Sequence, residues 1–189
     1  MNKKLHAFYG LKFNPFSQQV PTQVLFSQAQ IQSFCWRIEH QIAEGGFALV
    51  LGDPGAGKSA TLRLLADDLN ASRELCVGVL TRPQAKMADF YRELGHLFGV
   101  AISPNNRWCS SKDLREKWRS HIDTTLYRPV LLIDEAQEMN SAVLSELRLL
   151  TSADLDSRSI LTVILAGDQR LAARLDEPDS GLLTSGNCG

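Results

Sequence analysis

Residues 52–59 of this 189-residue chain read Gly-Asp-Pro-Gly-Ala-Gly-Lys-Ser, and they constrain its fold more than any other segment. The pattern G-x-x-x-x-G-K-[ST] needs a strand before it and a helix after it. An apolar run at 47–51 and a helix-like segment at 59–69 stand in those places. The glycines let backbone N–H groups turn inward around an anion, and the positive end of the following helix favours negative charge. The segment therefore predicts a strand, a phosphate-binding loop and a helix, in that order.

A nucleoside triphosphate is the ligand that this loop predicts, with ATP and Mg²⁺ bound together. Lys58 is expected to reach the β- and γ-phosphates as a mobile point charge, and the Ser59 hydroxyl to bind Mg²⁺. An incidental glycine-rich turn followed by Lys-Ser is the alternative interpretation. The residues expected to contact the nucleotide are Gly52, Asp53, Pro54, Gly55, Ala56, Gly57, Lys58, Ser59 and Ala60.

A second motif, at residues 130–135, consists of four apolar β-formers followed by two carboxylates, Asp134 and Glu135. A buried parallel strand is apolar on both faces, so carboxylates at its carboxyl end lie in the crevice where such sheets bind ligands. Asp134 is expected to hold Mg²⁺ through water or beside Ser59. Glu135 is placed to act as the general base that polarises the attacking water. The alternative is a strand followed by an acidic helix start, with Asp134 as a helix cap.

Composition is that of one cytoplasmic domain. With 44% hydrophobic residues and a formal net charge of −1, the chain can bury a sizeable core and has no global attraction to nucleic acid. No run approaches the roughly 18 apolar residues of a membrane span, so no membrane contact is expected. The four cysteines are widely separated and contain no C-x-x-C pair, which favours reduced thiols over a metal site or a disulfide framework.

Short apolar runs alternate with amphipathic stretches along the chain, which predicts an α/β fold with a parallel sheet flanked by helices. We expect an N-terminal arm over 1–27, a nucleotide-binding domain over 28–176 and an irregular tail over 177–189. The helix over 141–150 is expected to take Ser141 as its cap. The other predicted helices are 28–43, 59–69, 87–98 and 112–126, and the predicted strands are 47–51, 76–80, 130–133 and 161–166.

These parts, in this order, resemble the AAA+ ATPases of the secretion-pathway protein A and transposition-helper superfamily, over roughly residues 5–175. Besides the two motifs above, the resemblance depends on residues 8–16 (FYGLKFNPF), 44–50 (EGGFALV), 131–139 (LLIDEAQEM), 146–150 (ELRLL) and 165–168 (LAGD). Within that group, residues 37–40 (RIEH) and 80–84 (LTRPQ) look most like the helper ATPases encoded beside transposases.

The resemblance implies an ATP-dependent switch that assembles on duplex DNA, as a homo-oligomer, and recruits or activates a transposase. ATP binding would close the subunit interfaces, and hydrolysis through Glu135 would reset the assembly. Asp168 lies where such ATPases place a polar γ-phosphate sensor, although a carboxylate there repels phosphate unless it holds water or pairs with a cation. Gln169 is an alternative sensor, and Asp168 is alternatively a cap for a helix over 169–175.

The C-terminal residues 182–189 (LLTSGNCG) depart from the family pattern, in which an arginine finger, a fifth strand and a helical lid follow the fourth strand. Their lack of helical period and of charge indicates a truncated member, a frameshift remnant or an excised fragment. Without a fifth strand, the strand at 47–51 would form an open sheet edge. Because such fingers commonly contribute about 10³ to 10⁵ in turnover, we expect this chain to bind nucleotide but to hydrolyse it slowly by itself.

Local basic residues are the candidates for DNA contact. Lys112, Arg115 and Arg119 share one helical face at i, i+3 and i+7, and a solvated face with neighbouring acidic residues explains them equally well. Arg107 and Trp108 precede that stripe, Arg82 and Lys86 form a second candidate, and Arg148 and Arg158 are candidates for a neighbouring subunit's nucleotide, with burial or surface pairing as the alternative.

Two further functions stay open beside the transposition helper. One is an ATPase component of a secretion or envelope-assembly system without DNA affinity. The other is a degenerate chain that folds as a nucleotide-binding scaffold with little turnover.

Overall fold

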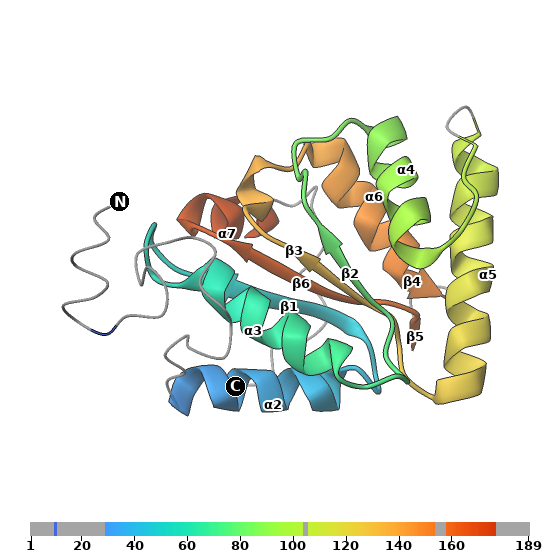
Figure 1. Cartoon of the computed structure of the whole chain (residues 1–189). Coiled ribbons are helices and arrows are strands. Elements are labelled where there is room, and N and C mark those ends of the chain that lie inside the picture. The colour runs from blue at the N-terminus through green and yellow to red at the C-terminus, as the bar shows by residue number, and fades with distance from the viewer. Residues whose placement is uncertain (1–9, 11–28, 104–105, 154–157, 177–189) are drawn as a thin grey trace.

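The computed structural model describes residues 10, 29–103, 106–153 and 158–176. Four parallel strands form its main sheet in the order β1-β6-β3-β2 (Figure 1). The strands are β1 (Gly46–Leu51), β2 (Val77–Leu80), β3 (Val130–Ile133) and β6 (Thr162–Gly167). Every residue of β3 and β6 is buried. The parallel sheet flanked by helices that the sequence predicts is confirmed.

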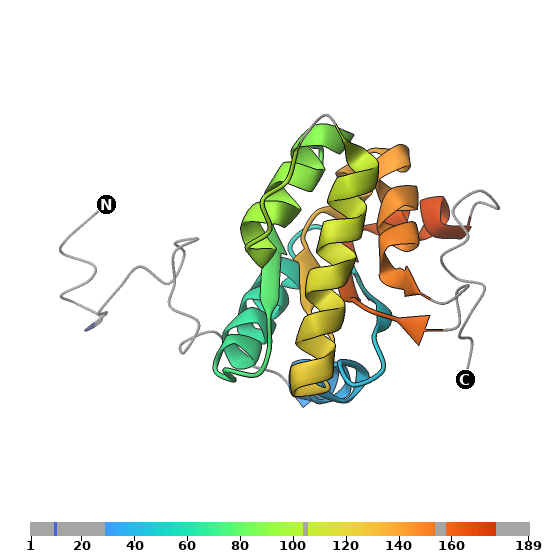
Figure 2. The same ribbon diagram turned by 90° about the vertical axis from the view of Figure 1, so that its right-hand side faces the viewer.

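Helices cover both faces of this sheet (Figures 1 and 2). Alternate β3 residues serve the two layers, because Val130 and Leu132 pack with one helix layer and Leu131 and Ile133 with the other. The first layer contains α2 (Ala29–Gln41) and α3 (Lys58–Asn70). The second contains α4 (Met87–Phe98), α5 (Arg107–Thr125), α6 (Ser141–Thr151) and α7 (Gln169–Asp176).

One predicted helix start and one predicted helix cap were wrong, and each error has a local cause. α5 begins at Arg107 rather than at 112, because the Asn106 side chain caps it by accepting a hydrogen bond from the Cys109 N–H at 3.1 Å. α6 is capped by Asn140 rather than by Ser141, since Asn140 Oδ1 accepts from the Ala142 N–H at 2.9 Å. Turn-forming asparagine side chains therefore set both boundaries.

Smaller elements complete the described chain. A 3₁₀ turn, η2 (Ala136–Glu138), follows β3, and a short antiparallel hairpin pairs β4 (Ser152–Ala153) with β5 (Arg158–Ser159). The sequence did not predict this hairpin. The expected arm, apart from Gly10, and the expected tail lie outside the described residues.

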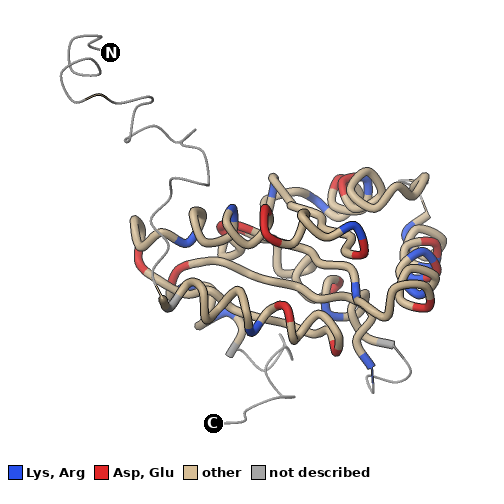
Figure 3. Tube along the Cα trace, turned by 60° about the horizontal axis from the view of Figure 1, so that its bottom comes forward, with Lys and Arg blue, Asp and Glu red and all other residues tan. Residues whose placement is uncertain are grey.

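The sheet register brings three strand ends together. Leu51 pairs with Gly167, and Ile133 pairs with Leu165, so the carboxyl ends of β1, β6 and β3 lie side by side. In the described chain, β1 and β2 are the edge strands. The four strands of the main sheet carry no charged residue, and apart from Arg158 on β5 the charges of the described residues lie on the helices and connections (Figure 3). None of the described helices combines the length and the apolar character needed to cross a bilayer.

Candidate functional site

The segment between β1 and α3 forms an open loop whose glycines are needed for its backbone conformation. Gly55 and Gly57 have φ angles of 84° and 86°, in the left-handed region that L side chains rarely adopt. A Cβ atom added to either glycine would meet no heavy atom within 4 Å, so space is not the constraint. A turn bond from the Ala56 N–H to the Asp53 carbonyl at 3.1 Å closes the loop. The predicted order of strand, glycine-rich loop and helix is therefore present.

Helix α3 starts inside this loop with its backbone donors free of a side-chain cap. Gly57 is the N-cap residue, and a glycine has no side chain with which to cap the helix. The first intrahelical acceptor is the Gly57 carbonyl, which receives the Thr61 N–H at 2.9 Å and the Thr61 hydroxyl at 3.1 Å. The N–H groups of the first helical turn have no intrahelical acceptors, and the helix dipole adds positive potential there. This end of α3 suits an anion.

Lys58 is folded back over the loop. Its Nζ donates to the carbonyls of Gly52 at 3.0 Å and Asp53 at 3.1 Å, and the residue is 9% exposed. Both acceptors are neutral carbonyls, whereas a phosphate oxygen carries negative charge and attracts the ammonium by an additional Coulomb interaction. Lys58 can therefore exchange these carbonyls for phosphate oxygens without leaving the loop. The exposed Ser59 hydroxyl stands beside it on the first turn of α3. This donor set fits the phosphates of ATP and its Mg²⁺.

The two carboxylates after β3 take different environments. Asp134 is half-buried, and its Oδ1 accepts a hydrogen bond from the Glu135 N–H at 2.9 Å. Glu135 is exposed and has a φ angle of 52°, a rare value for a residue with a side chain. Such strain is found at functional sites. The N-cap of η2 is Glu135 and no side chain caps that turn, so the structure does not use Asp134 as a helix cap. A magnesium ion shared by Asp134 and Ser59 stays a prediction.

Asp168, at the end of β6, is both a helix cap and one half of an ion pair. Its Oδ1 accepts from the Arg170 N–H at 2.9 Å, and the Arg170 guanidinium lies 2.8 Å from its Oδ2. The hydrogen bond from the Arg170 side chain, with a further contribution from Lys58, holds the pKa of Asp168 below its usual value. Asp168 therefore pairs with a cation, which is one of the conditions under which a carboxylate can lie near phosphate. Gln169 is exposed on the first turn of α7, and the identity of the γ-phosphate sensor stays a prediction.

Sequence reasoning missed Gln137, which lies at the centre of these groups. Its side-chain Nε2 donates to Glu135 Oε2, and its Oε1 accepts from the Asp168 N–H at 3.3 Å. Arg174 donates to the Gln137 carbonyl at 2.6 Å and to the Ser141 hydroxyl at 3.0 Å. The Asp-Glu-Ala-Gln run was visible in the sequence, but its partner, 31 residues later, was not.

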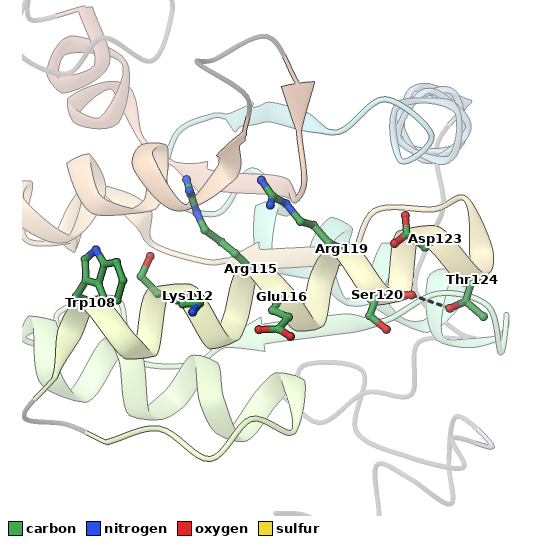
Figure 4. Close-up of a pocket in the computed structure, with 9 residues that line it drawn as sticks. Trp108, Lys112, Arg115, Glu116, Arg119, Ser120, Asp123 and Thr124 are labelled. Carbon is green, nitrogen blue, oxygen red and sulfur yellow. Dashed lines mark hydrogen bonds between the residues drawn. The ribbon is translucent and has the colours of Figure 1, made fainter.

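The basic residues proposed for DNA contact are distributed over a groove on α5 (Figure 4). Arg115 and Arg119 project to one side, towards α6 and the β4–β5 hairpin, and Glu116 and Ser120 to the other. Arg115 donates to the carbonyls of Leu149 and Ser152, so this arginine already has a structural role.

Arg107 and Lys112, which are also candidate cations, contact other side chains. Arg107 forms an ion pair with Glu146, and Lys112 lies 6.0 Å from the centroid of the exposed Trp108 ring. Arg148 is half-buried on α6, and Arg158 is exposed on β5. Acidic Glu116 and Asp123 line the same groove as the cations. The remaining candidates, Arg82 and Lys86, are exposed in the connection between β2 and α4.

Comparisons with known proteins agree with this geometry. A relative, General secretion pathway protein A of Aeromonas hydrophila, is 29% identical over 175 residues, which are 90% of this chain and 31% of the relative. Two solved structures share the fold, each with a TM-score of 0.60. Cdc6p from Pyrobaculum aerophilum is 15% identical, with 95% of this chain and 47% of that chain covered. The ORC2 protein of Aeropyrum pernix, solved as ADPNP-ADP complexes, is 12% identical, with 89% and 46% covered.

The chain thus spans about a third of the curated relative and under half of the two solved structures. The match that decides the family is to the AAA domain, and it covers residues 41–175, from the last residue of α2 through the loop, both carboxylates and α7. That range is most of the chain and contains every residue of the site. This protein belongs to the AAA domain family and is a member of the AAA+ ATPase superfamily that its motifs indicated.

Proposed function

We propose that this protein binds MgATP and hydrolyses it to ADP and phosphate. The observation that carries the proposal is the uncapped start of α3, with Lys58 held over it by two neutral carbonyls. Lys58 and the loop amides bind the phosphates, and Ser59 and Asp134 hold the metal. The metal, when bound, neutralises charge that develops on the phosphate oxygens. Glu135 accepts the proton of the attacking water.

Nucleotide binding is tested with a fluorescent ATP analogue and the variant Lys58→Ala. Removing a charge-assisted hydrogen bond to phosphate is expected to weaken binding at least about tenfold. Lys117→Ala is the matched control, because Lys117 is an exposed lysine on α5, away from the loop. Equal affinities for Lys58→Ala and the control would contradict the site.

Hydrolysis is tested with Glu135→Gln, which keeps the size of the side chain and removes the base. We expect nucleotide affinity to be retained and turnover to fall by about 10²- to 10⁴-fold. Turnover by the wild type is measured in the same assay. Unchanged turnover in Glu135→Gln would remove the residue from the reaction.

We further propose that the nucleotide state controls assembly on duplex DNA and recruitment of a transposase. The sequence resemblance at residues 37–40 and 80–84 supports this role, and Lys112 and Arg119 line a groove suited to a phosphate backbone. Removing one cation that pairs with a DNA phosphate should lower the slope of log affinity against log salt by about 0.9. Lys112→Ala is therefore expected to flatten the salt dependence of duplex binding, whereas Lys117→Ala, on the same helix but outside the groove, is expected to leave it unchanged.

A role in secretion is the second candidate, favoured by the 29% identity to General secretion pathway protein A. The two candidates differ in one observable property. A chain that binds ATP but shows no salt-sensitive affinity for duplex DNA supports the secretion role. Salt-sensitive DNA binding that depends on ATP supports the transposition helper.

A further inference from the structure

One peptide unit at the end of β6 joins the phosphate loop to the acidic motif. The Gly167 carbonyl accepts the Gly52 N–H at 3.2 Å, and the N–H on the other side of the same peptide bond, that of Asp168, donates to Gln137 Oε1 at 3.3 Å. A trans peptide is planar and points its carbonyl and N–H in opposite directions. Gly52 and Gln137 are therefore linked through a rigid group rather than through rotatable bonds.

The Gln137 amide continues this link to Glu135. Its Oε1 must face the Asp168 N–H, because only an oxygen can accept there, and this fixes which atom faces Glu135. The remaining atom, Nε2, donates to Glu135 Oε2. Gln137 is 7% exposed, so solvent offers its amide little competition.

Packing around Gln137 leaves its side chain little freedom. A Cβ atom at Gly167 would lie 2.7 Å from Gln137 Oε1, closer than real Cβ atoms approach, so any side chain at position 167 would displace the amide. The Arg174 guanidinium donates to the Gln137 carbonyl, and the Arg170 guanidinium lies 3.0 Å from the neighbouring Glu138 carboxylate. Helix α7 thus holds η2 at its backbone as well as through the amide.

We propose that Gln137 is a positioning residue that aligns the Glu135 carboxylate with an occupied phosphate loop. The inference rests on the proposed ATPase function and extends it to a residue outside the two motifs. With Oε2 held by the amide, Glu135 keeps Oε1 to accept a proton from water. A shift of Gly52 on phosphate binding moves the Gly167–Asp168 peptide, and the Gln137 amide transmits that shift to Glu135.

The variant Gln137→Glu tests the link because it separates the two halves of the amide. The new carboxylate keeps an acceptor for the Asp168 N–H, has nearly the same shape and loses the donor to Glu135. Single-turnover hydrolysis is measured with protein in excess, and nucleotide affinity with the fluorescent analogue. We expect hydrolysis to slow about 10- to 100-fold while affinity changes less than about threefold.

Two further variants separate positioning from folding. Gln137→Met removes both side-chain bonds without adding charge, and it should slow hydrolysis per folded molecule to a similar degree. Gln32→Glu is the matched control, since Gln32 is exposed on α2 and the same chemical change there should alter neither quantity. In a Glu135→Gln background, Gln137→Glu should have almost no additional effect, because groups that act as one unit are not additive.

The inference is overturned if both Gln137 variants hydrolyse ATP at the wild-type rate per folded molecule. It is equally overturned if Gln137→Glu slows hydrolysis as much without Glu135 as with it, or if the wild type binds ATP but hydrolyses it no faster than Glu135→Gln. A wild type that binds no nucleotide refutes the proposed function and the inference with it. Measuring binding separately from hydrolysis distinguishes these failures.

Discussion

The substitution Arg107→Met is expected to destabilise the protein because it removes the cation that pairs with the buried carboxylate of Glu146. The side chain of Glu146 is only 6% exposed, and it accepts hydrogen bonds from Arg107 and from the Tyr91 hydroxyl. Arg107 lies on α5, Glu146 on α6 and Tyr91 on α4, so the carboxylate joins three of the four helices of one layer. Without Arg107, a buried charge keeps a single neutral donor.

The expected loss of stability depends on how deeply each member of the Arg107–Glu146 ion pair is buried. Removing one partner of a fully buried pair costs about 3–5 kcal/mol, but the Arg107 side chain is 58% exposed, so water replaces part of what it provides. A hydrogen bond to a charged group is worth about 1.5–3 kcal/mol. We therefore expect Arg107→Met to lower the free energy of unfolding by about 2 kcal/mol. For a chain of this length, that corresponds to a Tm lower by about 4–8 °C.

The matched control is Arg92→Met, measured by urea unfolding at neutral pH. Arg92 pairs with Asp89, and its side chain is 60% exposed, nearly as much as that of Arg107, but the Asp89 side chain is 58% exposed. The control therefore differs mainly in burial of the carboxylate, and its destabilisation should be less than about 1 kcal/mol. With a denaturant slope of about 2 kcal/mol/M, Arg107→Met should lower the urea midpoint by about 1 M. Equal midpoints for the two variants would show that burial of the Glu146 carboxylate does not set the cost.

Two more outcomes follow from the same structure. Burial and the bond to Glu146 raise the pKa of Tyr91 in the folded state. The stabilisation that Tyr91 contributes is therefore fully present below its unfolded pKa of about 10, and it is lost as the pH rises towards the folded pKa. Tyr91→Phe should make the alkaline loss of folding stability shallower in urea unfolding over roughly pH 8–11. Gly45→Ala is expected to cost about 1–3 kcal/mol more than Gly99→Ala. Both glycines have positive φ, but only at Gly45 would a Cβ lie within 2.8 Å of Ser159 Cβ; equal destabilisation in thermal unfolding would show that crowding does not matter.

The loop and the strand-end carboxylates were predictable because each depends on neighbours in sequence. Glycine spacing sets the loop backbone, and an apolar strand that ends in Asp134 and Glu135 has only one edge of a parallel sheet at which to place them. The parallel order of the sheet followed from the alternation of apolar runs and helical periods. These features need no knowledge of distant contacts.

The remaining features depend on contacts between residues far apart in the chain. Gln137 and Asp168 are separated by 31 residues, and Arg115 reaches a carbonyl 34 residues away on α6. Helical spacing places Arg115 on a basic face, but only packing against α6 shows that it serves two carbonyls. The burial of Glu146 also depends on distant contacts, since no local pattern indicates that this carboxylate will be buried.

The unusual carboxylate at the end of β6 is compatible with phosphate binding once its partners are considered. Arg170 contacts both Asp168 and Glu138, so its positive charge offsets the negative charge of Asp168, at the start of α7, and that of Glu138, on η2. Because the pKa of Asp168 is held low, this carboxylate stays ionised, and the ion pair with Arg170 persists at neutral pH. The field that a phosphate meets then comes mainly from Lys58 and the start of α3, both of which attract it. Substituting Arg170 would remove that offset from Asp168, whose charge interacts with Lys58, so Arg170 supports the anion site without lying in it.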